Sequence, residues 1–93
     1  MHYFEDQALH DYRFIRLGAD YDRAEVSLEL EDPKGSPVTI KIGGVTAVSM
    51  TRTEPWGKGS CVVSSDIQYD ENGEKILTIH LDSGDEIEVR TKI

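Results

Sequence analysis

The chain has 93 residues, of which 38% are hydrophobic and 30% charged, with 18 acidic against 10 basic side chains. This length fits one β domain over residues 1–93, and the hydrophobic share suffices for a core, which excludes a wholly disordered chain. The net charge of −8 disfavours binding to nucleic-acid phosphates, and favours either simple solubility or docking to a basic protein.

The first predicted element is a strand over residues 11–17, which follows a segment, residues 2–9, that is either a short turn of helix or loose. The strand has apolar residues on both faces, so the sequence does not fix its register. Phe14 and Ile15 stand back to back in it and offer an outer apolar surface. An exposed strand edge or such a surface would also support a homodimer.

Residues 24–31 and 38–42 alternate apolar and polar side chains, which is the period of a half-buried strand. Between them, Asp32-Pro33-Lys34-Gly35 has the composition of a type I turn followed by a left-handed glycine. A loop of this length pairs Leu30 with Val38, Leu28 with Ile40 and Val26 with Ile42. All six side chains then share one face, so turn chemistry and hydrophobic register agree.

Residues 45–50 follow Gly43-Gly44, and a glycine pair within a strand often marks a bend or a bulge. We therefore expect this segment to continue or bend the strand over residues 38–42.

The C-terminal part predicts two further hairpins, with glycine-ended loops at residues 71–73 and 82–84. The first loop sets Ile67 against Leu77 and Val63 against Leu81, and the second sets Ile79 against Ile87 and Leu77 against Val89. The inward face of the strand before the first loop would hold Cys61, Val63, Ser65, Ile67 and Tyr69. The whole chain then predicts an all-β, antiparallel meander of six or seven strands, curled into a small sandwich or an open barrel.

Residues 53–60 form the one connection that does not fit this series of short turns. The segment is rich in glycine and contains Trp56, the only tryptophan, between Pro55 and Gly57. Two interpretations stay open. Trp56 either folds over the open end of the sheets as a hydrophobic lid, or is exposed as the anchor of an interface. In the second case the partner-binding residues are Arg52, Pro55, Trp56 and Lys58.

No catalytic, cofactor or metal site is predicted. His10 and Asp11 are neighbours on a strand, so their side chains would point to opposite faces and could not bind one metal ion together; a His–Asp pair that makes local hydrogen bonds at the strand start is expected instead. His80 falls on the outer face opposite Glu86. Cys61 is expected in the core. The glycines near Lys58 lack the spacing of a phosphate loop, and residues 70–74 lack that of a calcium loop.

The lone Cys61 excludes an intramolecular disulfide. The first seven residues lack the basic and apolar regions of a signal peptide, and no apolar run has the length of a membrane span. A cytoplasmic protein of bacterial type, without a membrane or nucleic-acid partner, is the expectation.

Leu9-His10-Asp11, Gly43-Gly44-Val45 and Pro55-Trp56-Gly57, followed by Ser60, resemble segments of a broad group of small bacterial proteins. Some members of that group resemble the immunity proteins of contact-dependent or polymorphic toxin systems. The resemblance implies a binding protein without catalytic residues.

These observations favour an acidic, non-catalytic protein-binding module, of the immunity-protein or antitoxin kind, with a basic protein as its partner. The alternative is a small-ligand binder that uses the mouth of the sheet, capped by Trp56. An enzyme is disfavoured, because no acid–base pair, metal set or activated nucleophile can be assembled from the sequence.

Overall fold

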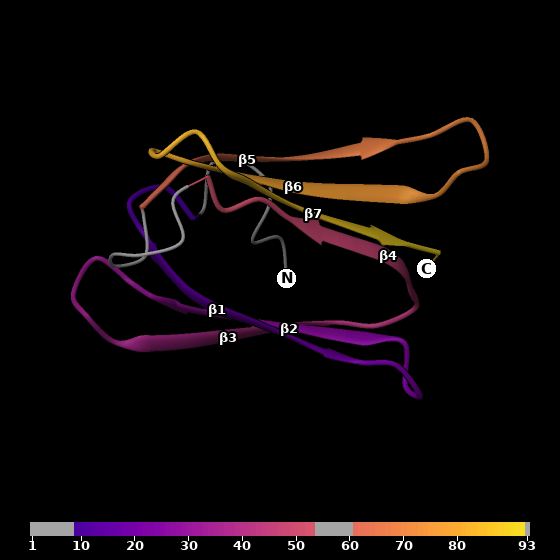
Figure 1. Cartoon of the computed structure of the whole chain (residues 1–93), viewed down its shortest axis with the longest axis horizontal. Helices are drawn as coiled ribbons and strands as arrows, with labels where there is room; N and C mark the ends of the chain where they lie inside the picture. Colours follow the sequence, from indigo (N-terminus) through magenta and orange to yellow (C-terminus); the bar gives the residue numbers. More distant parts are fainter. Residues whose placement is uncertain (1–8, 54–60, 93) are drawn as a thin grey trace.

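The computed structural model describes residues 9–53 and 61–92. They form seven strands: β1 (Arg13–Asp20), β2 (Glu25–Glu31), β3 (Pro37–Ile42), β4 (Val45–Met50), β5 (Val62–Tyr69), β6 (Lys75–Leu81) and β7 (Glu86–Thr91). One sheet has the order β1-β2-β3 and the other the order β4-β7-β6-β5, with every pairing antiparallel. The sheets face each other as an open sandwich and do not close into a barrel (Figure 1). The predicted all-β antiparallel fold is confirmed in its sandwich form.

The β2–β3 hairpin has the predicted register, with Leu30 opposite Val38, Leu28 opposite Ile40 and Val26 opposite Ile42. Its turn is fixed by Asp32, whose Oδ1 accepts hydrogen bonds from the backbone N–H groups of residues 34 and 36, both at 2.9 Å. Gly35 has a φ of 88°, the left-handed conformation that the turn requires and that glycine adopts without strain. The local turn chemistry therefore sets which side chains face the core.

The β5–β6 and β6–β7 hairpins also pair largely as expected. Ile67 lies opposite Leu77, which lies opposite Val89, and Ile79 lies opposite Ile87. The loop after β5 is an Asp-based turn of the same kind, because Asp70 Oδ1 accepts the N–H groups of residues 72 and 74 at 2.9 Å. Three of the four predicted cross-strand contacts in this sheet are confirmed.

The fourth contact is wrong, because the start of β5 contains a bulge. Val62, and not Val63, lies opposite Leu81, and the register shifts between Val62 and Ser64. An extra residue at this point reverses the phase of the inward and outward alternation. Val62 is consequently buried, while Cys61 and Val63, both expected on the core face, are exposed. Tyr69 keeps its predicted phase, opposite Lys75, but is 67% exposed because it lies at the end of the strand.

A second bulge explains the mixed pattern of the first strand. The β1–β2 register shifts between Phe14 and Arg16, so Ile15 is the extra residue. Phe14 points into the core with 7% of its surface exposed, whereas Ile15 is 45% exposed. Apolar residues on both faces of this segment are therefore the mark of a bulge, which changes the inward face part of the way along the strand.

The largest departure from the predicted order concerns β4. The segment was expected to continue or bend β3, but it crosses to the other sheet and pairs with β7. Gly44, with a φ of 65°, makes the crossing, and Thr91 Oγ1 donates to the carbonyl oxygen of Gly43 at 2.7 Å. The backbone N–H of Val45 donates to the carbonyl of Ala24 at 2.8 Å. The fold is thus two three-stranded meanders, and β4 is added beside the last strand of the second.

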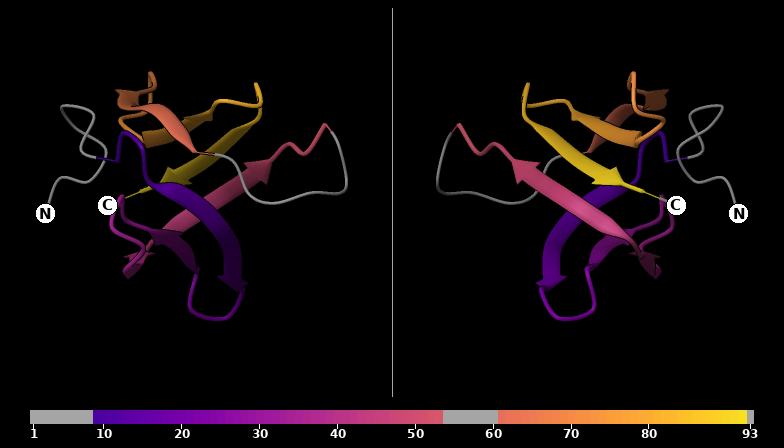
Figure 2. Two further views of the ribbon diagram at one scale, coloured as in Figure 1. Left: turned by 90° about the vertical axis from the view of Figure 1, so that its left-hand side faces the viewer. Right: turned by 90° about the vertical axis from the view of Figure 1, so that its right-hand side faces the viewer.

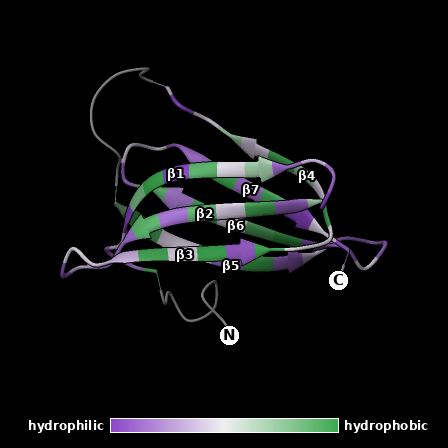
Figure 3. Cartoon of the chain, turned by 90° about the horizontal axis from the view of Figure 1, so that it is seen from below, coloured by the Kyte–Doolittle hydropathy of each residue, from purple (hydrophilic) through white to green (hydrophobic). Residues whose placement is uncertain are grey.

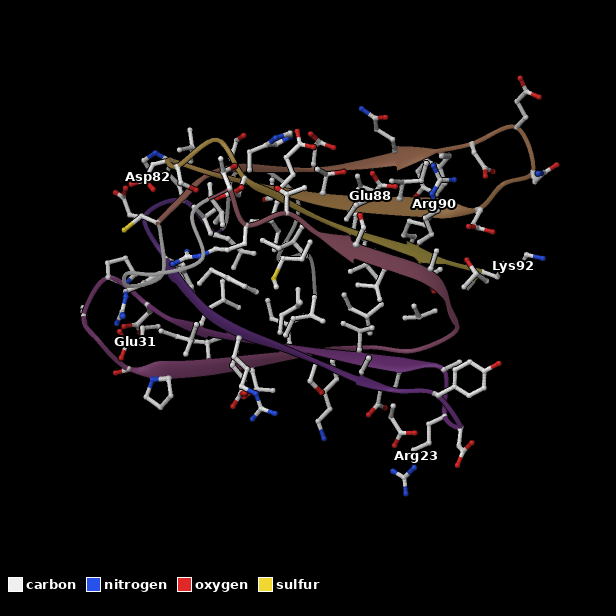
Figure 4. All side chains as sticks on the ribbon, in the orientation of Figure 1. Arg23, Glu31, Asp82, Glu88, Arg90 and Lys92 are labelled. Carbon is white, nitrogen blue, oxygen red and sulfur yellow. The ribbon has the colours of Figure 1, made fainter. Side chains whose placement is uncertain are left out.

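The core lies between the two sheets, which both contribute to it. Apolar and polar residues alternate along most strands (Figure 3), and the apolar side chains fill the space between the layers. The charged side chains of Glu88 and Arg90 lie on the outer surface of the four-stranded sheet (Figure 4). The buried hydrophobic residues are Leu9, Phe14, Val26, Leu28, Leu30, Ile40, Ile42, Val62, Leu77, Ile79, Leu81, Ile87 and Val89.

Candidate functional site

The predicted partner-binding residues lie in the connection that follows β4. Arg52 is exposed, directly after the strand. Pro55, Trp56 and Lys58 lie outside the described residues, so the choice between a core lid and an interface anchor for Trp56 stays a prediction. The described part of the connection, residues 51–53, nevertheless shows how its start is held.

Asp85 fixes the chain where it leaves β4. Its buried carboxylate accepts hydrogen bonds from Thr53 Oγ1 at 2.8 Å, the Thr53 backbone N–H at 2.9 Å and Thr51 Oγ1 at 3.1 Å. Ser83 Oγ donates to the other oxygen at 2.8 Å. These hydrogen bonds lower the pKa of Asp85 from 3.8 to about 2. The Thr53 side chain contributes most, followed by Ser83, the Thr53 backbone and Thr51. A charged group on the β6–β7 turn therefore anchors the start of the connection that follows β4.

The inner face of β4 exposes two apolar side chains on the core side of the sandwich. Val48 lies opposite Val89, and Met50 lies opposite Ile87, so each pair shares one face of the sheet. Val89 and Ile87 are 1% exposed, but Val48 and Met50 are 37% and 50% exposed. The reason is geometric: four strands face three, and β4 is the edge strand of the wider sheet (Figure 2).

A groove opens beside the first half of β4, toward the β1–β2 turn. Its volume is about 470 Å³. We call it the β4 groove, and its lining residues are Ala19, Asp20, Tyr21, Ala24, Glu25, Val26, Val45, Thr46, Ala47 and Val48. Six of these ten side chains are alanine or valine, and the only charged ones are acidic. The groove therefore combines a small apolar floor with a negative rim.

Acidic side chains also flank β4 on its outer side. Glu88 lies opposite Ser49 and contacts Arg90 at 3.1 Å. Glu86, whose carbonyl accepts the N–H of Thr51, contacts His80 at 3.1 Å. In the groove, Glu25 has no ion pair among the described residues. Carboxylates thus lie on both faces of the sheet beside β4, in keeping with the charge of the whole chain.

The histidines form polar contacts of their own. His10 Nδ1 lies 3.3 Å from Asp11 Oδ2, so the expectation that these side chains point apart is wrong. The reason is that Asp11 belongs to a turn with a φ of 70°, where strand alternation does not hold. His80 lies opposite Glu86, as expected, and also contacts Asp66 at 3.3 Å. Within residues 9–53 and 61–92, no group of three or more His, Cys, Asp or Glu side chains is suited to a metal ion.

A second hollow, of about 360 Å³, lies on the outer face of the three-stranded sheet. It is formed where Gly18 pairs with Ser27, two small residues between larger neighbours. Arg16 and Glu29 form an ion pair at 3.1 Å within its lining. Its one basic side chain is thus already paired, and we regard this hollow as the weaker candidate.

Comparison of the chain with protein-family models, curated proteins and solved structures found no match. Within the part of the chain that the structure describes, no helix is long and apolar enough to cross a membrane.

The sequence predicts a site in the connection after β4, but not on β4 itself. A signal was present: residues 45–50 contain no charged side chain, although 30% of the chain is charged. An uncharged segment with apolar residues two apart was assigned to the core strands, because nothing local indicates that it becomes an edge strand with an uncovered face.

Proposed function

We propose that this protein is a non-catalytic protein-binding module, of the immunity-protein or antitoxin kind, and that it docks a basic protein partner at β4. The observation that carries the proposal is the exposure of Val48 and Met50 on the core side of the sandwich. Monomeric proteins expose contiguous apolar surface sparingly, and such surface beside polar groups commonly marks an interaction site.

The charge of the site specifies the partner. Asp20 and Glu25 in the β4 groove, together with Glu86 and Glu88 on the neighbouring strand, present carboxylates on both sides of the exposed apolar side chains. Complementary charge accelerates encounter and disfavours wrong partners, while the buried apolar contacts supply most of the affinity. A basic partner with an apolar contact surface therefore fits this site, and its association should weaken as salt screens the charges.

Arg52 and the following loop belong to the same interface in this proposal. The Asp85 hydrogen bonds hold residues 51 and 53, so the side chain between them starts from a fixed backbone beside Met50. Arginine and tryptophan are enriched among the residues that dominate binding energy at interfaces. We propose that Arg52, Pro55, Trp56 and Lys58 extend the docking surface beyond the end of β4.

Binding of a small ligand between the sheets has less support. Leu28 and Ile79, one from each sheet, are fully buried, and the space between the layers is filled by the core side chains. The β4 groove lies outside this core and is open to solvent at the margin of the sandwich.

The proposal is tested by affinity capture from the native host with matched variants. The double variant Val48→Asp/Met50→Asp places charges on the docking face, and Val63→Asp places one on an exposed valine of β5, the opposite edge of the same sheet. We expect wild type and Val63→Asp to recover the same basic protein, more at about 50 mM than at about 300 mM salt. The double variant should recover at least tenfold less.

Two results would contradict the proposal. One is the absence of any specific partner at both salt concentrations. The other is equal recovery by the wild-type protein and the double variant, provided that circular dichroism shows the variant to be folded.

A further inference from the structure

The four edges of the sandwich differ in how well they are protected against pairing with another chain. An edge strand presents unpaired backbone groups, and charged residues or proline normally prevent another strand from adding to it. β1, β3, β4 and β5 are the edge strands. The protecting residues are Arg13, Arg16 and Asp20 on β1, Pro37 and Lys41 on β3, and Asp66 on β5. β4, with the sequence VTAVSM, carries neither a charge nor a proline.

The backbone of β4 has its free hydrogen-bonding groups at the exposed residues. Thr51 donates its N–H to the carbonyl of Glu86 at 3.0 Å, which makes this a hydrogen-bonded pair. Hydrogen-bonded and non-hydrogen-bonded pairs alternate along an antiparallel ladder. The next pair, Met50 with Ile87, and the pair Val48 with Val89 are therefore of the second kind. The N–H and C=O groups of Val48 and Met50 accordingly point away from β7, toward the open edge.

The unpaired backbone groups and the exposed apolar side chains of β4 thus belong to the same two residues. Val48 and Met50 present unpaired backbone groups along the edge and exposed apolar side chains on the inner face. The strand is 6 residues long, which corresponds to about 20 Å of extended chain. An added strand would continue the four-stranded sheet along Val48 and Met50, because the N–H of Val45 at the start of the strand is already bonded to Ala24. Its inward side chains would cover the inner face of this half of β4.

We infer that the partner binds by strand addition, as an extended segment of alternating apolar and basic residues that pairs with the free edge of β4. This inference rests on the proposed function and specifies its mode. The apolar residues of the segment face inward, toward Val48 and Met50. Its basic residues face outward, on the side of the sheet where Glu86 and Glu88 lie. A second copy of this chain fits less well, because it would bring a further net charge of −8 to an already acidic edge.

The probe is a capped nine-residue peptide of alternating lysine and valine, followed by NMR of the ¹⁵N-labelled full chain. We expect saturable shifts centred on β4, and at least tenfold slower hydrogen exchange of the Val48 and Met50 amides in the bound state. Two control peptides should bind at least tenfold more weakly. One has N-methyl groups on alternate residues, which blocks backbone pairing, and the other has glutamate in place of lysine.

A matched pair of protein variants tests backbone pairing by changing β4 instead of the peptide. Val48→Pro removes the outward N–H and leaves the β4–β7 hydrogen bonds in place, because proline is tolerated where the N–H faces solvent. Val48→Thr keeps the N–H and the branched shape. We expect Val48→Pro to lose at least tenfold in peptide affinity relative to Val48→Thr. The N-methylated peptide keeps the inference testable if Val48→Pro does not fold.

Several results would overturn the inference: no saturable shift at millimolar peptide, shifts centred on β1, β3 or β5, or equal binding of the N-methylated peptide. Dimerisation of the free protein through β4, seen by analytical ultracentrifugation, would also overturn it, since a second copy would then be the occupant. The same variants distinguish failure of this inference from failure of the proposed function. If Val48→Pro captures the natural partner as well as wild type does, while Val48→Asp/Met50→Asp does not, then docking at β4 is supported and strand addition is refuted.

Discussion

Met50 and Ile87 provide a direct measure of how far the docking face is uncovered. They are opposite each other on neighbouring strands and point to the same face, but 50% of Met50 and 1% of Ile87 is exposed. Truncation of each to alanine removes three heavy atoms. The two variants therefore compare a buried and a half-exposed position in the same layer of side chains.

The expected costs follow from burial. Ile87→Ala removes three buried carbon atoms at about 0.8 kcal/mol each and leaves a cavity, so its free energy of unfolding should fall by about 3.5 kcal/mol. Met50→Ala removes a side chain that is half in water and leaves no closed cavity, so its cost should be about 1 kcal/mol. Both lie within the total stability of about 5–14 kcal/mol expected for a domain of this size.

Urea unfolding followed by far-ultraviolet circular dichroism measures the difference. With an m-value of about 1.5 kcal/mol/M, the midpoints should fall by about 2.3 M for Ile87→Ala and about 0.7 M for Met50→Ala. Neither shift should depend on protein concentration. If the two variants cost the same within about 0.5 kcal/mol, or if the cost of Met50→Ala grows with concentration, Met50 is covered in solution and the account of an uncovered face is refuted.

Three further outcomes are expected. Asp85→Asn should destabilise the protein most above pH 4 and progressively less as the pH falls toward about 2. The reason is that the pKa of Asp85 is about 2 in the folded state and 3.8 in the unfolded state, so the charged form stabilises the fold above pH 3.8. A difference in unfolding free energy between wild type and variant that stays constant across this pH range in urea unfolding would contradict this prediction. Cys61 should react with a thiol reagent in the native state, and a requirement for denaturant would contradict its exposure. Phe14→Ala should cost about 3–5 kcal/mol and Ile15→Ala under about 1 kcal/mol in thermal or urea unfolding, and similar costs would argue against the bulge in β1.

The hairpins could be predicted because their determinants are local. An aspartate before the turn and a left-handed glycine at its end fix the loop length, and the loop length fixes which residues pair. The register of β2 with β3, and that of β5 with β6 beyond its bulge, follow from these few residues. The β6–β7 turn has Leu81 in the position of the aspartate and shares only the left-handed glycine, Gly84. Nothing beyond the turn and the alternation of apolar residues was needed.

The bulges and the position of β4 have no comparable local signal. From the sequence Cys61-Val62-Val63, either Val62 or the pair Cys61 and Val63 could face the core. In the structure Val62 faces the core, and its N–H donates to the carbonyl of Tyr12, just before β1, at 2.7 Å. The crossing at Gly43 and Gly44 is held by Thr91, nearly fifty residues along the chain. Such long-range partners decide the topology, and the candidate site depends on the topology.

The unequal sheets connect the fold to the proposed role. The three-stranded layer leaves the second half of β4 uncovered, because Val48 and Met50 are exposed whereas Val45 packs against the core. The first half of β4 is held on both sides, by Ala24 from the β1–β2 turn and by Thr91 from β7. Among residues 9–53 and 61–92, the far end is held within its own sheet, through Thr51 and the Asp85 hydrogen bonds. An edge strand that is fixed at both ends but uncovered between them is preorganised for pairing, so a partner strand loses little affinity to ordering of this protein.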